Sequence, residues 1–112
     1  MKKIEAIVRP ESVEEVRSAL REAGVTGIMI SEIEGHGKQN GVVQQWRGEK
    51  YKVELLPKAK MELIVRDQDV ERLCQVIIDH AKTGEIGDGK IFIYDVQDAI
   101  RIRTGERQDS AV

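Results

Sequence analysis

The segment KIEAIVR at residues 3–9 returns in altered form as KMELIVR at residues 60–66. Two dipeptides repeat at the same offset, Val13-Glu14 with Val70-Glu71 and Thr26-Gly27 with Thr83-Gly84. Two copies are too few for a solenoid, so they indicate a duplicated supersecondary unit.

Each unit has the pattern strand, helix, strand. Apolar residues alternate over residues 3–9, which predicts a strand with one apolar face. Apolar positions at steps of three and four predict a helix over 11–23, and Gly24 stands where a helix-ending glycine belongs. A second strand is expected over 27–35. The second unit repeats the pattern, with a strand at 60–66, a helix whose apolar stripe contains Val70, Leu73, Cys74 and Ile77, and a strand at 91–94.

Two such βαβ units in one short chain predict the ferredoxin-like, split βαβ arrangement. The fold class is therefore α+β, in the order βαββαβ, with a long loop between the second and third strands. With 112 residues, the chain is expected to form a single domain over 1–112. Both helices should cover one face of the sheet. The other face is apolar in places, which favours a homo-oligomer.

Composition excludes several classes of function. A net charge of -2, with 34% charged residues, is not the basic footprint of a nucleic-acid-binding protein. No apolar run approaches the about 20 residues that a membrane span needs, and the first residues do not resemble a signal peptide. The single cysteine, Cys74, cannot form an internal disulfide, so a reducing, cytoplasmic setting is expected.

The link between the second and third strands is much longer than a hairpin requires, since it runs from about residue 36 to residue 56. Long loops of this kind are usually functional or disordered. Trp46 and Tyr51 argue against a simple linker, because linkers avoid large aromatic residues. A featureless insertion is the alternative interpretation.

The segment GEIGDGK at residues 84–90 carries the clearest chemical signal. It satisfies most of the Walker A pattern, but Ile91 stands where a magnesium-binding Ser or Thr is required, and a strand rather than a helix follows. A P-loop NTPase is therefore excluded. Three glycines still allow backbone N–H groups to face an anion, and Lys90 adds a positive charge. A plain glycine-rich turn is the alternative.

Further cations supplement this segment. In an extended chain, Arg101 and Arg103 would project to one side, and arginine suits bidentate phosphate contacts. Lys58 and Lys60 flank the start of the third strand, where the long link returns. Taken singly, each of these residues is better explained as a solvated surface charge.

No catalytic residue is expected. The sequence shows no Ser/His/Asp or Cys/His set typical of nucleophilic catalysis. His36 and His80 have no partner at metal-ligand spacing, so neither supports a zinc site.

These residues resemble the PII family of nitrogen-regulatory signal-transduction proteins. The similarity extends from MKKIEAI at 1–7 to IRIRTGE at 100–106, and its most specific part is TGEIGDGKIF at 83–92. That segment resembles the nucleotide-binding B-loop of the family. RGEKY at 47–51 and LPK at 56–58 resemble the T-loop and its return. The resemblance places the T-loop at about 36–56, the B-loop at about 82–90 and the C-loop at about 101–112.

The resemblance implies a non-enzymatic homotrimer with nucleotide sites in the clefts between subunits. ATP and ADP would compete there, and 2-oxoglutarate would bind beside Mg-ATP. The T-loop would control partner proteins, such as an ammonium transporter or nitrogen-assimilation enzymes and regulators. Neither nucleic-acid binding nor membrane insertion is implied.

The resemblance also implies particular site residues. For the nucleotide they are Met29, Gly35, Gly37, Lys38, Gln39, Glu62, Ile64, Gly87, Asp88, Gly89, Lys90, Arg101 and Arg103. For 2-oxoglutarate they are Arg9, Gln39, Lys58 and Gly87, and Gln39 would complete the magnesium site. Tyr51 is a candidate for nucleotidylation, and the implied partner contacts are Trp46, Arg47 and Tyr51.

Three departures from the family pattern stand out. Lys38 replaces the usual arginine, which turns a bidentate phosphate contact into a point charge. Met29 replaces a usual threonine and so loses a hydroxyl group. Trp46, Glu49 and Lys50 alter the first family signature, and Glu49 replaces the serine that some relatives phosphorylate.

Two rival functions share this architecture. An acylphosphatase-like enzyme would need an arginine and asparagine set on the phosphate, and Asn40 is the only asparagine. An RNA-binding module would need aromatic residues on the sheet for base stacking. Phe92 and Tyr94 are the only aromatic residues in the expected strands, and the net charge has the wrong sign.

Overall fold

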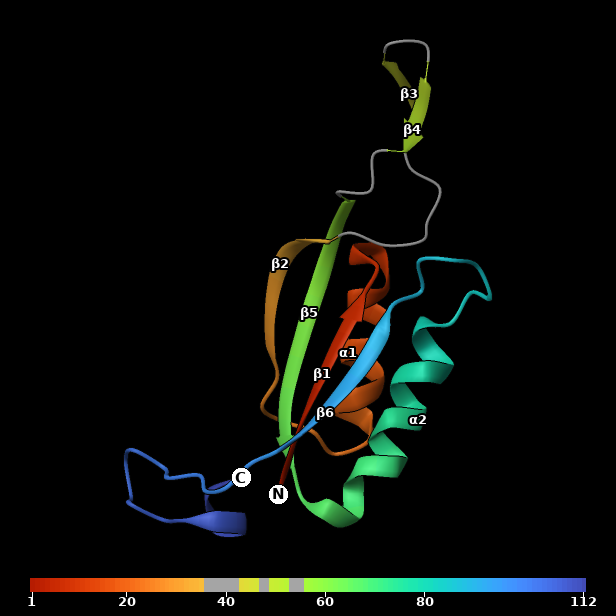
Figure 1. The fold of residues 1–112 in the computed structure, drawn as a ribbon. Coiled ribbons are helices and arrows are strands. Elements are labelled where there is room, and N and C mark those ends of the chain that lie inside the picture. The colour runs from red at the N-terminus through yellow and green to blue at the C-terminus, as the bar shows by residue number, and fades with distance from the viewer. Residues whose placement is uncertain (36–42, 47–48, 53–55) are drawn as a thin grey trace.

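The computed structural model describes residues 1–35, 43–46, 49–52 and 56–112 (Figure 1). Its helices and strands are β1 (Lys2–Val8), α1 (Val13–Glu22), β2 (Met29–Gly35), β3 (Val43–Trp46), β4 (Glu49–Lys52), β5 (Leu56–Val65), α2 (Val70–Ala81) and β6 (Lys90–Asp95). Short 3-10 turns cover Pro10–Ser12, Asp67–Asp69 and Gln108–Ala111.

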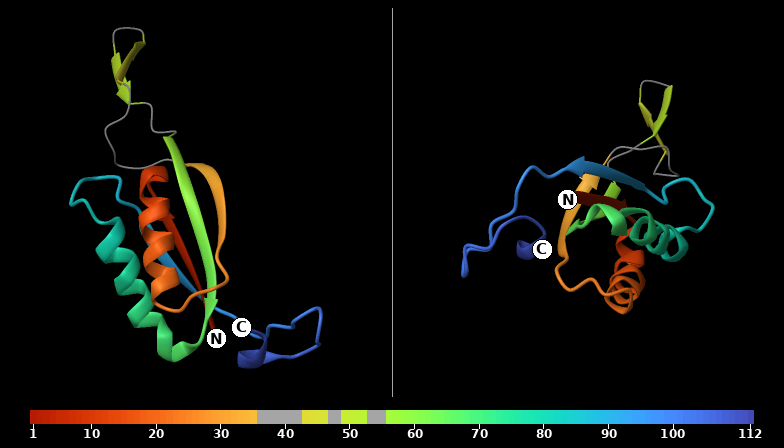
Figure 2. Two further views of the ribbon diagram at one scale, coloured as in Figure 1. Left: turned by 180° about the vertical axis from the view of Figure 1, so that it is seen from behind. Right: turned by 90° about the horizontal axis from the view of Figure 1, so that it is seen from below.

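One antiparallel sheet contains four of the strands, in the order β2-β5-β1-β6. The helices α1 and α2 lie together on one face of this sheet, as the two views of Figure 2 show. Each half of the chain supplies two strands that are separated in the sheet by a strand of the other half. The predicted ferredoxin-like split βαβ fold is therefore confirmed. β3 and β4 form a separate two-stranded ladder.

The core lies between the sheet and the two helices. The alternating residues Ile4, Ala6 and Val8 of β1 are at most 2% exposed, as the period-two pattern predicted. Four residues of β5 are buried in the same layer, and they meet the apolar stripes of both helices. Cys74 packs against this core, and burial raises the pKa of its thiol. Non-polar burial of this kind is the main stabilising term of the fold.

Both helices begin after a 3-10 turn, so α1 starts at Val13 rather than at the predicted residue 11. The reason is local: Pro10 fixes the backbone of the first turn, and the N–H of Ser12 bonds to the carbonyl of Arg9. At the other end, Gly24 has a φ of +98°, which confirms the predicted glycine at the helix end.

The third strand of the sheet, β5, begins at Leu56 instead of the predicted residue 60. Pro57 lies in this extension and pairs only with Glu34 of β2, because the ladder with β1 starts at Ala59. A proline is tolerated at such a position, since no second neighbour requires its missing N–H. The predicted long link therefore ends four residues before the repeat begins.

The sheet face opposite the helices carries a row of charged groups in its centre. The Lys3 ammonium lies 3.2 Å from the Glu62 carboxylate and 3.5 Å from that of Glu5. Tyr94 donates a hydrogen bond of 3.1 Å to Glu5, which raises the pKa of the phenol. Exposed apolar side chains, among them Phe92, occupy the strands beside this row. The expectation that this face is apolar in places is thus confirmed.

Candidate functional site

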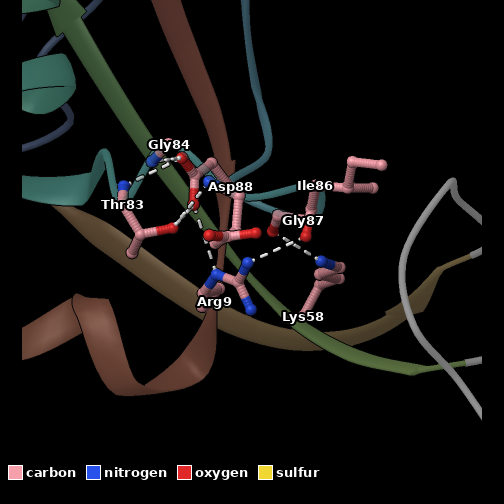
Figure 3. Close-up of polar contacts among 8 residues, drawn as sticks. Arg9, Lys58, Thr83, Gly84, Ile86, Gly87 and Asp88 are labelled. Carbon is pink, nitrogen blue, oxygen red and sulfur yellow. Dashed lines mark hydrogen bonds and ion pairs between the residues drawn. The ribbon is translucent and has the colours of Figure 1, made fainter.

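The segment from residue 82 to residue 90, here called the glycine loop, connects α2 to β6 (Figure 3). Its shape depends on the Asp88 carboxylate. One oxygen, Oδ2, accepts hydrogen bonds of 2.8 Å from the backbone N–H groups of Thr83 and Gly84, and Oδ1 accepts one of 2.5 Å from the Thr83 hydroxyl. These bonds, led by that of the Thr83 hydroxyl, lower the pKa of Asp88 to about 2.

Two glycines give the loop its turns. Gly87 has a φ of +105° and Gly89 a φ of +108°, a region that residues with a side chain rarely adopt. Turns with positive φ can form concave arrangements of backbone N–H groups that bind anions. The anion site that the sequence predicts in the glycine loop stays a prediction.

Two cations from distant strands hold the glycine loop against the sheet. Arg9, which follows β1, donates a hydrogen bond of 2.9 Å to the Ile86 carbonyl, and its Nε lies 3.4 Å from the Asp88 carboxylate. Lys58 of β5 donates a hydrogen bond of 2.9 Å to the Gly87 carbonyl. Figure 3 shows both side chains pointing at the loop. The sequence motif alone gave no sign of these contacts.

Lys58 is the one charged side chain that is buried among the described residues, with 7% of its surface exposed. Burial is the main cause that lowers its pKa, and the nearby Arg9 guanidinium lowers it further. Its hydrogen bond goes to a carbonyl rather than to a carboxylate. The two neighbouring cations create a positive potential at this point, which the Glu11 and Asp88 carboxylates reduce.

The C-terminal arm, residues 98–112, lies at the opposite end of the sheet (Figure 1). The Asp98 carboxylate accepts hydrogen bonds from the Arg107 guanidinium, the Gln108 side-chain amide and the N–H of Ala99. The bond from Arg107 is the main cause that lowers the pKa of Asp98, and the backbone N–H groups of Ala99 and Gln108 lower it further. An isolated bridge between Ile100 and Arg107 closes the arm into a loop.

The prediction that Arg101 and Arg103 lie in an extended chain is wrong. The chain turns over residues 102–104, because the N–H of Gly105 bonds to the Arg101 carbonyl at 2.7 Å. Gly105 permits this turn with a φ of +75°. Ile102 is fully exposed at the turn, and the Arg101 guanidinium lies 3.4 Å from the Glu106 carboxylate.

Apart from Gly35, the described residues that the resemblance assigned to the nucleotide or to 2-oxoglutarate fall into two groups. The first, here called the loop half, contains the 2-oxoglutarate candidates Arg9 and Lys58 together with Gly87 to Lys90. The second, here called the arm half, contains Met29, Glu62, Ile64, Arg101 and Arg103. In the arm half, Met29 pairs with Glu62 across β2 and β5.

A cavity of about 680 Å³ lies on the side of the arm half, lined by Met29 and Ile64 together with Ala99, Ala111 and Val112 of the arm. The strand β6 connects the glycine loop to the arm. At about 3.3 Å per residue, its six residues separate the two by about 20 Å. One chain therefore does not bring Arg101 and Arg103 to the glycine loop.

Several predicted residues belong to the long link. Gly37, Lys38, Gln39 and Arg47 lie outside the described residues. Gly35 ends β2, Trp46 ends β3, and Tyr51 lies in β4, opposite Gln44. The ladder of β3 and β4 was not predicted, although the β-favouring residues Val43, Trp46 and Tyr51 were a signal for it.

Four groups that shape the site are not predicted from the sequence. They are the Thr83 hydroxyl, the Ile86 carbonyl, the Asp98 carboxylate and the Glu106 carboxylate. Thr83 was part of the repeated Thr-Gly dipeptide, but the repeat suggested only a structural equivalence. The other three contacts depend on chain turns that no local pattern specifies.

The fold and the site together define a ferredoxin-like α+β protein with a glycine loop held by two cations and a separate arginine-bearing arm. The family described as Nitrogen regulatory protein P-II matches residues 1–106. The chain belongs to this family. In the part of the chain that the structure describes, no helix has the length and hydropathy of a membrane span.

Individual relatives match over the whole length. The chain is 48% identical to "Nitrogen regulatory protein P-II" of Pasteurella multocida (strain Pm70), over 100% of both proteins. It is 49% identical to "Nitrogen regulatory protein P-II 1" of Escherichia coli (strain K12), again over 100% of both. It is also 49% identical to "Nitrogen regulatory protein P-II 2" of Methanothermobacter thermautotrophicus, over 100% of this chain and 97% of the relative.

Proposed function

We propose that this protein is a cytoplasmic, non-enzymatic regulator of nitrogen metabolism that binds ATP or ADP and, together with Mg-ATP, 2-oxoglutarate. Membership of the P-II family supports the regulatory role. The ligand proposal rests mainly on the burial of the Lys58 ammonium next to Arg9 and the glycine loop. Such a cation attracts an anion that can replace its carbonyl partner.

The glycine loop offers two sides to anions. All described peptide bonds are trans, so a carbonyl and the following N–H point in opposite directions. The carbonyls of Ile86 and Gly87 face Arg9 and Lys58, so the N–H groups of Gly87 and Asp88 face away from these cations. The N–H side suits nucleotide phosphates, and the side of Lys58 suits the carboxylate of 2-oxoglutarate.

A complete nucleotide site requires a second copy of the chain. The glycine loop and the arginines of the arm lie too far apart to contact one phosphate group within a subunit. In a homo-oligomer, the arm half of one copy joins the loop half of the next, which agrees with the trimer that the resemblance implies. The exposed apolar residues on the open sheet face, such as Phe92 and Met29, would be covered in this assembly.

The magnesium ion would be held mainly by oxygen atoms of ATP and 2-oxoglutarate. Among the described residues, no group of three or more His, Cys, Asp or Glu side chains could hold a metal ion. This fits an ion bound by ATP phosphates and 2-oxoglutarate, with Gln39 as its protein ligand. The ion would neutralise the negative charge where the two anions meet.

Partner proteins would bind the T-loop, about residues 36–56. Trp46, Arg47 and Tyr51 are the proposed contact residues, since aromatic and arginine side chains dominate interface energies. The proposed partners are an ammonium transporter or a nitrogen-metabolism enzyme or regulator. Nucleotidylation of Tyr51 would change this surface.

Native mass spectrometry tests the central proposal. The expected result is a trimer that gains three ATP molecules, and 2-oxoglutarate only when Mg-ATP is present. Calorimetry on Lys90→Ala and Arg103→Ala should show ATP affinity reduced by about one to two decades each. Unchanged affinity in both variants would contradict the site, and release of phosphate from an acyl phosphate would favour an enzyme instead.

A further inference from the structure

The Asp88 side chain directs both of its oxygens back into the glycine loop. Oδ2 accepts from the N–H groups of Thr83 and Gly84, and Oδ1 accepts from the Thr83 hydroxyl and lies near Arg9 Nε. The Thr83 hydroxyl oxygen in turn accepts a hydrogen bond of 3.1 Å from the N–H of Glu85. We propose that Asp88 and Thr83 are positioning residues, which fix the loop in its phosphate-binding shape without touching the phosphate themselves.

This inference rests on the proposed nucleotide site. It differs from the resemblance, which places Asp88 among the residues that contact the nucleotide. A carboxylate that contacted a triphosphate would repel it. Here the Asp88 carboxylate accepts hydrogen bonds from Thr83 and Gly84 and lies near Arg9. It is therefore on the Arg9 side of the loop, away from the side where the N–H groups would face phosphate. Asp88 stays ionised down to a pH of about 2, because its bonds to Thr83 and Gly84 lower its pKa.

The pairing of Asp88 with Thr83 determines which way the loop peptides face. It closes the chain from residue 83 to residue 88 into a ring, while Arg9 connects that ring to the end of β1. With the ring closed, the carbonyls of Ile86 and Gly87 point at Arg9 and Lys58. If the ring opened, these peptides could rotate and present carbonyl oxygens to the phosphate, which would be repulsive.

A purely electrostatic role for Asp88 predicts the opposite change in ATP affinity on substitution. If Asp88 acted only through its charge, Asp88→Asn would remove a negative group near ATP and tighten binding. If Asp88 positions the loop, the same substitution weakens binding, because an amide NH2 group would face the donors of Thr83, Gly84 or Arg9. The direction of the change therefore separates the two roles.

The experiment measures ATP binding by calorimetry for wild type, Asp88→Asn, Thr83→Val and Thr83→Ser. The expected result is about tenfold weaker binding or more for Asp88→Asn and Thr83→Val. Thr83→Ser keeps the hydroxyl and should stay within about twofold of wild type. Circular dichroism and native mass spectrometry check that each variant folds and assembles.

Hydrogen exchange of the nucleotide-free protein tests the ring independently of ATP. Amides of residues 83–90 should lose protection in Asp88→Asn and Thr83→Val and keep it in Thr83→Ser, while α1 is unchanged in all. Equal or tighter ATP binding by Asp88→Asn, or wild-type loop protection in Thr83→Val, would overturn the proposal. A wild-type protein that does not bind ATP would instead overturn the proposed function.

Discussion

Gly89 lies directly against Ile7, so that a β-carbon at residue 89 would stand 1.7 Å from the Ile7 carbonyl oxygen. Ile7 pairs with Lys90 in the ladder of β1 and β6, one residue beyond this contact. The close approach holds the end of the glycine loop on the backbone of β1. The position of the loop thus depends on the absence of a side chain at residue 89.

Gly89→Ala should therefore displace the loop and weaken ATP binding. Gly84→Ala is the matched control, because Gly84 also has a positive φ, +90°, but has open space where its β-carbon would be. Gly84→Ala should lower the free energy of unfolding only by the backbone strain of about 1–2 kcal/mol. Thermal unfolding and calorimetry should show a larger loss of both stability and ATP affinity in Gly89→Ala. Equal losses in the two variants would mean that the contact with Ile7 is unimportant.

Lys58→Met should abolish binding of 2-oxoglutarate. The buried ammonium is the proposed partner of the effector carboxylate, and methionine keeps the length of the side chain without its charge. Calorimetry with 2-oxoglutarate, in the presence and absence of Mg-ATP, measures this effect. The coupled site would be contradicted if Lys58→Met bound 2-oxoglutarate as tightly as wild type does. It would also be contradicted if the wild-type protein bound 2-oxoglutarate equally well with and without Mg-ATP.

The same substitution should change how stability depends on pH. Burial lowers the pKa of Lys58 in the folded protein below its ordinary value of 10.5, so the unfolded chain binds this proton more tightly. Lys58 therefore makes stability rise with pH between the lowered pKa and 10.5. Thermal unfolding from pH 8 to about 10.5 should show a smaller rise, or a steeper fall, in Lys58→Met than in wild type.

Glu106→Gln should strengthen ATP binding about two- to fivefold, the equivalent of about 0.5–1 kcal/mol for an exposed ion pair. Arg101 is paired with Glu106 at 3.4 Å in this structure, so phosphate must compete with that carboxylate. Asp109→Asn is the control, because it removes the same charge from the arm without removing the partner of Arg101. A similar gain in both variants would assign the effect to net charge alone.

Mixed oligomers test whether the loop half and the arm half of a site come from different copies. Lys90→Ala damages only the loop half, and Arg103→Ala damages only the arm half. Any mixed trimer of the two variants contains one intact site if the halves come from neighbouring chains, and none if they come from the same chain. Native mass spectrometry of co-expressed, differently tagged chains should show tight binding of one ATP per mixed trimer. Mixed trimers without such a site would contradict the composite arrangement.

Deletion of residues 42–52 should abolish partner binding and preserve ATP binding and assembly. Gly35 and Leu56 are directly paired at the end of the ladder between β2 and β5, so the ends of the link are already adjacent. A shorter link changes the closure cost little. Pull-down of the partner and calorimetry with ATP measure the two effects. If the deletion variant binds its partner with full affinity, the alternative interpretation of the link as a featureless insertion is favoured.

The sequence by itself determined the architecture. The alternation at residues 3–9 and its copy at residues 60–66 specified two buried strand faces, because side chains alternate between the two sides of a strand. The helical stripes specified which helix faces join that core. The glycines specified the turns of the glycine loop, since positive φ values are a property of the local chain, and together with Lys90 they predict an anion site there.

The tertiary structure alone decided which groups reach that loop and which do not. Arg9 and Asp88 are 79 residues apart, and they meet because the register of β1 on β6 sets Ile7 opposite Lys90. The same strand, β6, carries Arg101 and Arg103 away to the far end of the sheet. Local patterns contain neither fact, because contacts between distant segments depend on strand order and register, and these are fixed only when the whole core packs.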